Sequence, residues 1–124
     1  MNVDEINRSI LLVRPRQPYL DWAASLPNPT PVTLDDLRED CNAYLVAEIS
    51  DPGDELAVLQ NHYAAIFEHE LAGWVTEEDL WPNRRTLSMF TEWFDLEFHG
   101  MAFDLRANKI SSHTVEPDGH ETTT

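Results

Sequence analysis

Basic residues are scarce in this chain, and glycine and cysteine are scarce too. The sequence has 8 Lys and Arg residues against 23 Asp and Glu, which gives 124 residues a formal net charge of −15. Direct binding to nucleic acid or to an anionic membrane usually depends on a basic surface, so we expect neither. The 4 glycines are isolated, and neither a GxxxxGK loop nor a GxSxG motif occurs. These absences argue against a nucleotide-dependent enzyme and a serine hydrolase.

The single cysteine and the lack of long apolar runs indicate the compartment. Cys41 has no second cysteine to pair with, and it precedes the apolar run 43–49, where a thiol usually packs as a small hydrophobic group. No apolar stretch reaches the roughly 18 residues of a membrane span. Residues 1–9 also lack the basic and apolar regions of a signal peptide. We therefore expect a soluble protein of the reducing cytoplasm.

The composition favours one folded domain. Hydrophobic residues make up 42% of the chain and aromatic residues 10%, which is enough for a core at this length. We expect a flexible segment at residues 1–8, a single domain at 9–106 and a disordered tail at 107–124. The tail is expected to be disordered because it is mostly polar, with only isolated apolar residues.

Three segments have the patterns of β-strands. Residues 10–13 form a short run of Ile, Leu and Val, and residues 43–49 are apolar on both faces, which favours an interior strand. Residues 94–105 begin with a strict alternation of apolar and polar side chains, and Gly100 marks an expected bulge.

The clearest helix is expected at residues 54–72. Asp51 is its predicted N-cap, Pro52 falls in the first turn, and Gly73 can take the left-handed conformation at the end. A helical periodicity places most of its apolar side chains on one face, which consists of Leu56, Leu59, Tyr63, Ile66, Phe67, Leu71 and Trp74. This face is wide enough to cover a sheet.

Shorter helices are expected at 18–26, 34–40, 76–81 and 85–93. Two of them begin with the pattern of a capping box, formed by Thr33 with Asp36 and by Thr76 with Asp79. The order of strands and helices does not alternate regularly. It therefore predicts an α+β fold, with a small sheet of about three strands and helices packed mainly on one face.

Acidic residues are concentrated in one segment. Between Pro31 and Leu80 the chain has 13 Asp and Glu residues and a single basic residue, Arg38. Some of these carboxylates complement helix dipoles, and the remainder is available to a basic partner. The residues predicted to bind that partner, including one tryptophan expected to be exposed, are Asp35, Asp36, Glu39, Asp40, Glu77, Glu78, Asp79 and Trp81.

A metal site is an alternative use of the polar side chains. Asp95, Glu97 and His99 alternate along one strand and point to the same side, and oxygen with imidazole suits Zn²⁺, Mn²⁺ or Fe²⁺. Neighbours on one face of a strand are about 7 Å apart, so the three cannot share one ion without a bulge. The same obstacle, at about 10 Å, applies to a stripe on the long helix that consists of Glu55, His62 and His69.

Glu70 is unusual because the helical periodicity places it between Ile66 and Trp74, inside the apolar face. A buried carboxylate requires a hydrogen-bonding or charged partner. It can serve as a general acid, or it can form a structural ion pair with one of the arginines Arg14, Arg16, Arg84 and Arg85.

Three stretches of the sequence, residues 14–22, 67–74 and 93–101, resemble a family of small acidic bacterial proteins with no assigned activity. They include the segments Arg-Pro-Arg-Gln-Pro-Tyr-Leu-Asp-Trp and Phe-Glu-His-Glu-Leu-Ala-Gly-Trp. The resemblance extends over roughly residues 8–106 and implies a bacterial, cytoplasmic protein. Its motifs are aromatic and structural, so it implies no catalytic residue.

The leading hypothesis is a non-catalytic interaction module, without a cofactor, that binds a basic protein surface such as that of a nucleic-acid-binding protein. One alternative is a metal-dependent hydrolase or small-molecule binder that uses Asp95, Glu97 and His99, with Glu70 or His69 approaching from the long helix. Another is a structural homodimer with aromatic residues in its interface, in which the acidic residues serve solubility.

Overall fold

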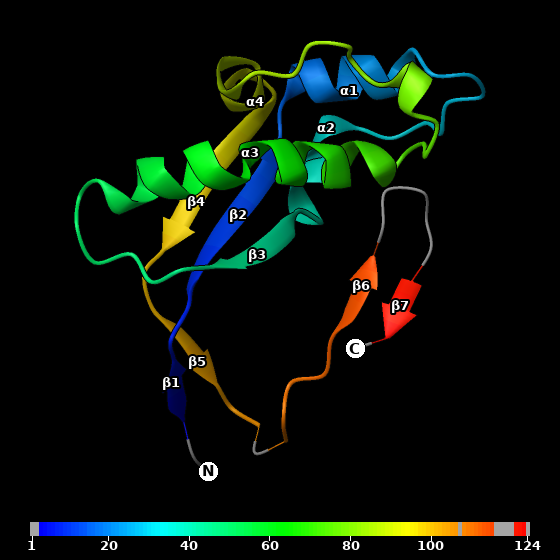
Figure 1. The fold of residues 1–124 in the computed structure, drawn as a ribbon. Coiled ribbons are helices and arrows are strands. Elements are labelled where there is room, and N and C mark those ends of the chain that lie inside the picture. The colour runs from blue at the N-terminus through cyan, green and yellow to red at the C-terminus, as the bar shows by residue number, and fades with distance from the viewer. Residues whose placement is uncertain (1–2, 107, 116–120, 124) are drawn as a thin grey trace.

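A computed structural model describes residues 3–106, 108–115 and 121–123 (Figure 1). The elements follow one another along the chain as β1 (Asp4–Ile6), β2 (Ser9–Pro15), α1 (Gln17–Ala24), α2 (Leu34–Glu39), β3 (Asn42–Val46), α3 (Asp54–Ala72), the 3₁₀ turn η1 (Glu78–Leu80), α4 (Leu87–Trp93), β4 (Phe94–His99), β5 (Ala102–Asp104), β6 (His113–Val115) and β7 (Glu121–Thr123). None of the helices in these ranges combines the length and hydropathy that a transmembrane span requires.

The main sheet has three antiparallel strands in the order β3-β2-β4. In its central strand, Leu11 lies opposite Tyr44 of β3 and Phe98 of β4. Side chains of β2 alternate between buried and half-buried, so one face of the sheet belongs to the core. The expectation of an interior strand at 43–49 is wrong, because β2 occupies the centre of this sheet and β3 lies at its edge.

Two short ribbons accompany the sheet. β1 pairs with β5, and β6 pairs with β7, both in antiparallel fashion. Residues 100 and 101 separate β4, which pairs with β2, from β5. The sequence indicated no strand at the positions of β1, β6 and β7, because three residues are too few for an alternating pattern to be recognised. The expected domain boundaries near residues 8 and 106 stay a prediction.

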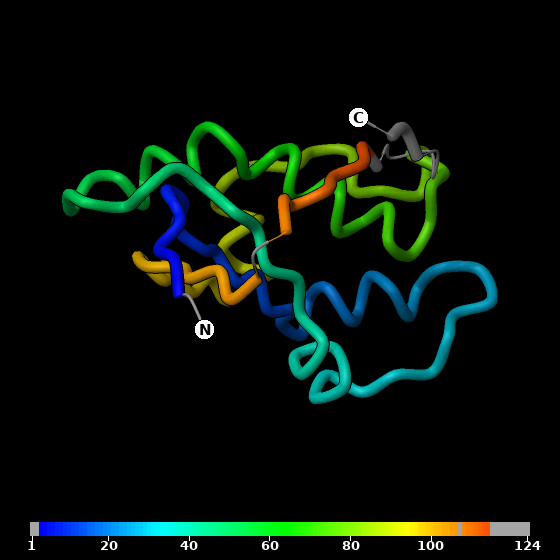
Figure 2. Tube along the Cα trace, turned by 90° about the horizontal axis from the view of Figure 1, so that it is seen from below, coloured from blue at the N-terminus to red at the C-terminus, as the bar shows by residue number. Residues whose placement is uncertain are grey.

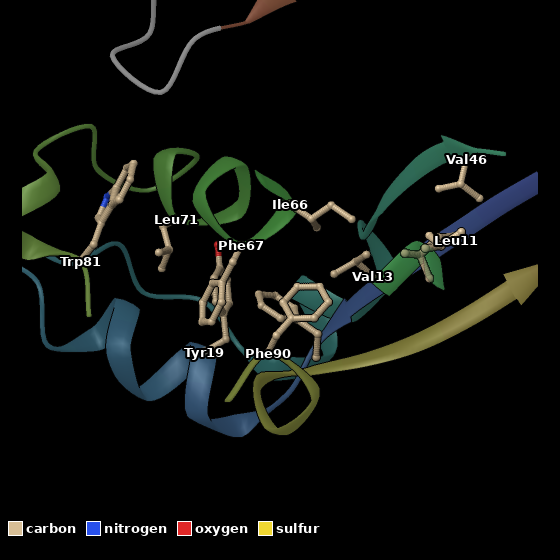
Figure 3. Close-up of a cluster of buried hydrophobic side chains, with 11 residues drawn as sticks. Leu11, Val13, Tyr19, Val46, Ile66, Phe67, Leu71, Trp81 and Phe90 are labelled. Atoms are coloured by element: carbon tan, nitrogen blue, oxygen red, sulfur yellow. The ribbon is translucent and has the colours of Figure 1, made fainter. Parts of the chain in front are cut away.

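Helix α3 crosses the sheet (Figure 1) and closes the core with Phe67 and Leu71, both fully buried. The rings of Phe67 and Phe90 lie 5.7 Å apart between centroids, and Figure 3 shows Tyr19 beside them. The predicted α+β fold, with its small sheet and helices packed mainly on one face, is therefore confirmed. The predicted apolar face of the helix is wrong at Leu56, which is 54% exposed while Val58 is buried.

Both ends of α3 differ from the prediction. The N-cap is Gly53, without a side-chain cap bond, and Asp51 does not fill that role. Instead, the Asp54 carboxylate accepts hydrogen bonds from the backbone N–H groups of Ser50 and Asp51, each at 2.8 Å. At the other end Gly73 has φ −64°, an ordinary right-handed conformation. The helix thus begins without a side-chain cap bond and ends without a left-handed glycine.

The two predicted capping boxes have different outcomes. Before α2, Thr33 Oγ1 accepts from the Asp36 N–H at 3.1 Å, and the Asp36 carboxylate accepts from the Thr33 N–H at 3.2 Å, so this box is confirmed. The helix expected at 76–81 is only a three-residue 3₁₀ turn, whose N-cap is Glu77 without a side-chain cap bond. Thr76 therefore caps no helix. The turn begins at Glu78, so Thr76 lies two residues before it and not at the capping position.

Candidate functional site

The acidic side chains of α2 are presented to solvent. Asp35, Asp36, Glu39 and Asp40 are all exposed. Asp36 completes the capping box, and the other three form no side-chain hydrogen bond or ion pair within the described residues. These carboxylates are exposed because α2 is only six residues long and begins with a capping box, so its acidic side chains point to solvent.

The second acidic turn, at Glu77, Glu78 and Asp79, is also exposed. Figure 2 shows it apart from α2, with α1 running between them. Trp81 next to this turn is only 3% exposed, so the expectation of an exposed tryptophan is wrong. Its indole N–H donates to the Val75 carbonyl at 2.8 Å, which explains how the ring is buried without an unpaired donor.

The arginines nearest to the acidic segment turn towards β4. Arg38 of α2 donates to the Asp95 carboxylate at 2.9 Å and to the Pro15 carbonyl at 3.1 Å. Arg14 of β2 forms an ion pair with Glu97 at 2.7 Å. Both pairs are partly exposed, so each contributes little to stability. The two pairs matter for the distribution of charge. Both arginines neutralise carboxylates of β4, which lie outside residues 31–80, so the charge of the acidic segment is not reduced.

Asp95, Glu97 and His99 lie on the exposed side of β4, as the alternation predicted. Glu97 is hydrogen-bonded to His99 and to Arg14; the bond to His99, followed by the bond to Arg14, holds the pKa of its carboxyl below the ordinary value. Asp95 faces Arg38 instead. Among residues 3–106, 108–115 and 121–123, no group of three His, Cys, Asp or Glu side chains is placed to hold a metal ion. Within the other predicted stripe, Glu55 and His62 are exposed on α3.

Glu70 lies in the core-facing side of α3, only 6% exposed. Its partners are neutral: Asn42 Nδ2 donates to Oε2 at 2.6 Å, and the Tyr44 hydroxyl donates to the same oxygen at 2.5 Å. An ion pair with Arg14, Arg16, Arg84 or Arg85 does not occur among the described residues. The carboxylate is therefore satisfied at one oxygen by hydrogen bonds from β3.

Tyr44 also connects Glu70 to His69. Its hydroxyl lies 2.8 Å from His69 Nδ1 and has one proton, which it donates to the carboxylate, so Nδ1 of His69 is the donor in this contact. Burial, followed by the charge of Glu70, raises the pKa of Tyr44 well above its ordinary value. The same causes raise the pKa of Tyr19, whose hydroxyl donates to the backbone carbonyl of Glu70 at 2.6 Å. Both tyrosines are thus neutral donors at physiological pH.

A pocket of about 380 Å³ opens beside this hydrogen-bond network, between the end of α2, the start of β3 and the end of α3. We call it the acidic pocket and define it by Asp40, Asn42, His69, Glu70 and Trp74, which line it. The volume lies at the lower end of the range for ligand sites, about 300–1,000 Å³. The fold thus brings Asp40, His69 and Glu70, which the sequence had suggested for separate roles, into one concave surface.

Sequence reasoning missed Asn42 and Tyr44 as partners of Glu70. They are 28 and 26 residues away along the chain, and only the pairing of β3 with β2 brings them to the end of α3. The sequence did contain one signal for the position of Tyr44. The alternation along the predicted strand places Tyr44 on the same face as Val46, which is buried. Cys41 also lines the pocket and is half-buried, as expected for a small apolar group at the edge of a core.

Comparison of the chain with protein-family models, with curated proteins and with solved structures finds no match. The resemblance to a family of small acidic bacterial proteins stays a prediction. The chemistry of the surface and of the pocket is therefore the basis for a proposed function.

Proposed function

We propose that this protein is a non-catalytic interaction module that binds a basic protein surface. The main support is that, in the described part of the chain, no ion pair involves any of the 13 acidic residues between Pro31 and Leu80. The only basic residue of this segment, Arg38, neutralises Asp95 outside it. A surplus of one sign that the fold leaves uncompensated favours association with the opposite sign.

Helix α2 presents this charge in the most defined way. Its capping box fixes the turn, and Asp35, Glu39 and Asp40 are exposed on it. Carboxylates on a fixed turn accelerate the encounter with Lys and Arg, although each exposed pair adds only about 0.2–1 kcal/mol of affinity. A protein that binds DNA or RNA has such a basic surface, so it is the class of partner that we favour. The single cysteine supports the cytoplasm as the compartment.

Capture with matched variants tests this proposal. The immobilised protein is exposed to a bacterial lysate at low ionic strength, next to an α2 variant with Asp35→Asn, Glu39→Gln and Asp40→Asn. Asp36 stays unchanged because it completes the cap. The control variant removes the same charge from exposed positions elsewhere, with Glu5→Gln, Asp21→Asn and Glu92→Gln.

We expect the wild type and the control variant to retain the same basic proteins and the α2 variant to lose them. Salt should release them, because the Debye length falls from about 10 Å at 0.1 M to about 3 Å at 1 M. The proposal is refuted if no basic protein is retained, or if the α2 variant retains the same basic proteins as the control variant does.

A further inference from the structure

We propose that the acidic pocket receives an arginine side chain of the basic partner. This inference rests on the proposed function and names the group by which the partner is recognised. The pocket adjoins α2, since Asp40 follows the last residue of that helix and lines the pocket. A partner drawn to the exposed carboxylates of α2 therefore meets the opening of the pocket at the same surface.

One oxygen of the Glu70 carboxylate has no hydrogen-bond donor among the described residues. Both hydrogen bonds to this carboxylate, from Asn42 and Tyr44, go to Oε2, and no described residue donates to Oε1. The side chain is only 6% exposed, yet the described residues contain no fully buried polar side-chain atom without a partner. Oε1 is therefore not fully buried, and Glu70 is one of the residues that line the pocket. A carboxylate oxygen without a protein donor is free to accept a hydrogen bond from a ligand in the pocket.

The lining of the pocket is acidic. Asp40 and Glu70 contribute carboxylates, and no Lys or Arg is among the residues that line the pocket. The nearest arginine on α2, Arg38, is already bonded to Asp95 and to the Pro15 carbonyl. No Lys or Arg of the described residues thus lines the pocket. A ligand that brings one removes the cost of keeping two carboxylates uncompensated in a concave site.

The side chains that line the pocket suit guanidinium better than ammonium. Asn42 uses its Nδ2 for Glu70, which leaves its Oδ1 as an acceptor in a residue that lines the same pocket as Glu70 and Asp40. A guanidinium group has five N–H donors in one plane, no acceptor and a flat face, so it can bond several such acceptors at once. Trp74, which is half-buried and also lines the pocket, offers aromatic surface of the kind on which guanidinium stacks. An ammonium group matches only part of this arrangement.

An NMR titration tests the proposal with Nα-acetyl-arginine methylamide as the probe. The matching citrulline derivative has nearly the same shape without the charge, and the lysine derivative has the charge without the plane. We expect the arginine probe to shift the resonances of Asn42, Gly73 and the Trp74 indole. The citrulline probe should leave them unchanged, and the lysine probe should bind more weakly. Equal effects of the arginine and citrulline probes would overturn the proposal.

Two charge variants locate the binding. Asp40→Asn is expected to weaken arginine binding about two- to fivefold, whereas Asp35→Asn, also on exposed α2 but not among the residues that line the pocket, should leave it unchanged. Glu70→Gln should weaken it about tenfold or more. Circular dichroism verifies the fold of each variant, and should Glu70→Gln unfold, the pair of surface variants still decides. Equal effects of Asp40→Asn and Asp35→Asn would overturn the proposal.

Failure of this proposal can be told apart from failure of the proposed function. If the arginine probe does not bind but the α2 variant still loses its basic proteins, the pocket proposal is overturned and the interaction module stands. If the probe binds but no basic protein is retained, the pocket is a site for a small cation. That result overturns both the proposed function and this use of the pocket.

Discussion

The hydroxyl of Tyr44 gives the sharpest stability prediction. Tyr44→Phe removes the 2.5 Å hydrogen bond to Glu70 Oε2 and the 2.8 Å contact with His69, and it leaves Asn42 as the only described donor to that carboxylate. A hydrogen bond to a charged group contributes about 1.5–3 kcal/mol. Because Tyr44 is half-buried, water can replace part of it. We therefore expect the free energy of unfolding to fall by about 2 kcal/mol, and the melting temperature by about 8 °C.

Urea unfolding followed by tryptophan fluorescence measures this change. The control is Tyr63→Phe, since Tyr63 is half-buried on α3 and its hydroxyl has no hydrogen bond among the described residues. Its cost should stay within about 0.5 kcal/mol. If Tyr44→Phe costs no more than this control, the bond between Tyr44 and Glu70 does not form in solution, and the description of the carboxylate's environment is refuted.

A double-mutant cycle with Asn42→Ala extends the same test. Asn42 and Tyr44 donate to the same oxygen, so the loss of the second donor leaves the Glu70 carboxylate with no described donor at all. The cost of the double variant should therefore exceed the sum of the single costs by more than about 0.5 kcal/mol. Strict additivity would show that the two side chains do not share this acceptor.

Further predictions concern the caps, the core and pH. Thr33→Ala should lower the free energy of unfolding by about 1 kcal/mol, because Thr33 caps α2. Thr76→Ala should lower it by less than about 0.5 kcal/mol, because Thr76 caps no helix. A larger loss for Thr76→Ala than for Thr33→Ala in urea titrations would contradict this assignment of the caps. Phe67→Ala should lower the free energy of unfolding by about 3–5 kcal/mol, because Phe67 is fully buried. Leu56→Ala should lower it by less than about 1 kcal/mol, because Leu56 is exposed. Similar losses for the two variants would mean that α3 packs another face against the sheet. Because the pKa of Glu97 is lowered in the folded protein, its carboxylate stabilises the fold at pH values above the ordinary carboxyl pKa. This stabilisation is lost as the pH falls through the folded-state pKa, so the difference in stability between wild type and Glu97→Gln should shrink from neutral to strongly acidic pH. A constant difference would contradict this prediction.

Local features of the fold were predictable from the sequence. The capping box at Thr33 and the extent of the long helix follow from short-range patterns, and both occur in the structure. Strand order depends instead on which segments pair, and the apolar character of residues 43–49 did not indicate an edge strand. The same reason applies to the site. The burial of Glu70 follows from the helical periodicity, whereas its donors come from β3, which reaches α3 only through tertiary packing.

The position of Arg38 explains why the acidic residues of α2 remain available. Its guanidinium donates hydrogen bonds to the Pro15 carbonyl at the end of β2 and to the Asp95 carboxylate on β4. These bonds connect α2 to the sheet. Leu37 packs beside it against the core. The one cation of the acidic segment is therefore used to orient the helix rather than to neutralise it, and Glu39 and Asp40 are left facing solvent. Replacing Arg38 by a neutral residue would make the segment still more acidic, but it would also loosen the helix that presents the charge. We therefore expect binding of the proposed basic partner to depend on the geometry of α2 and not on its charge alone.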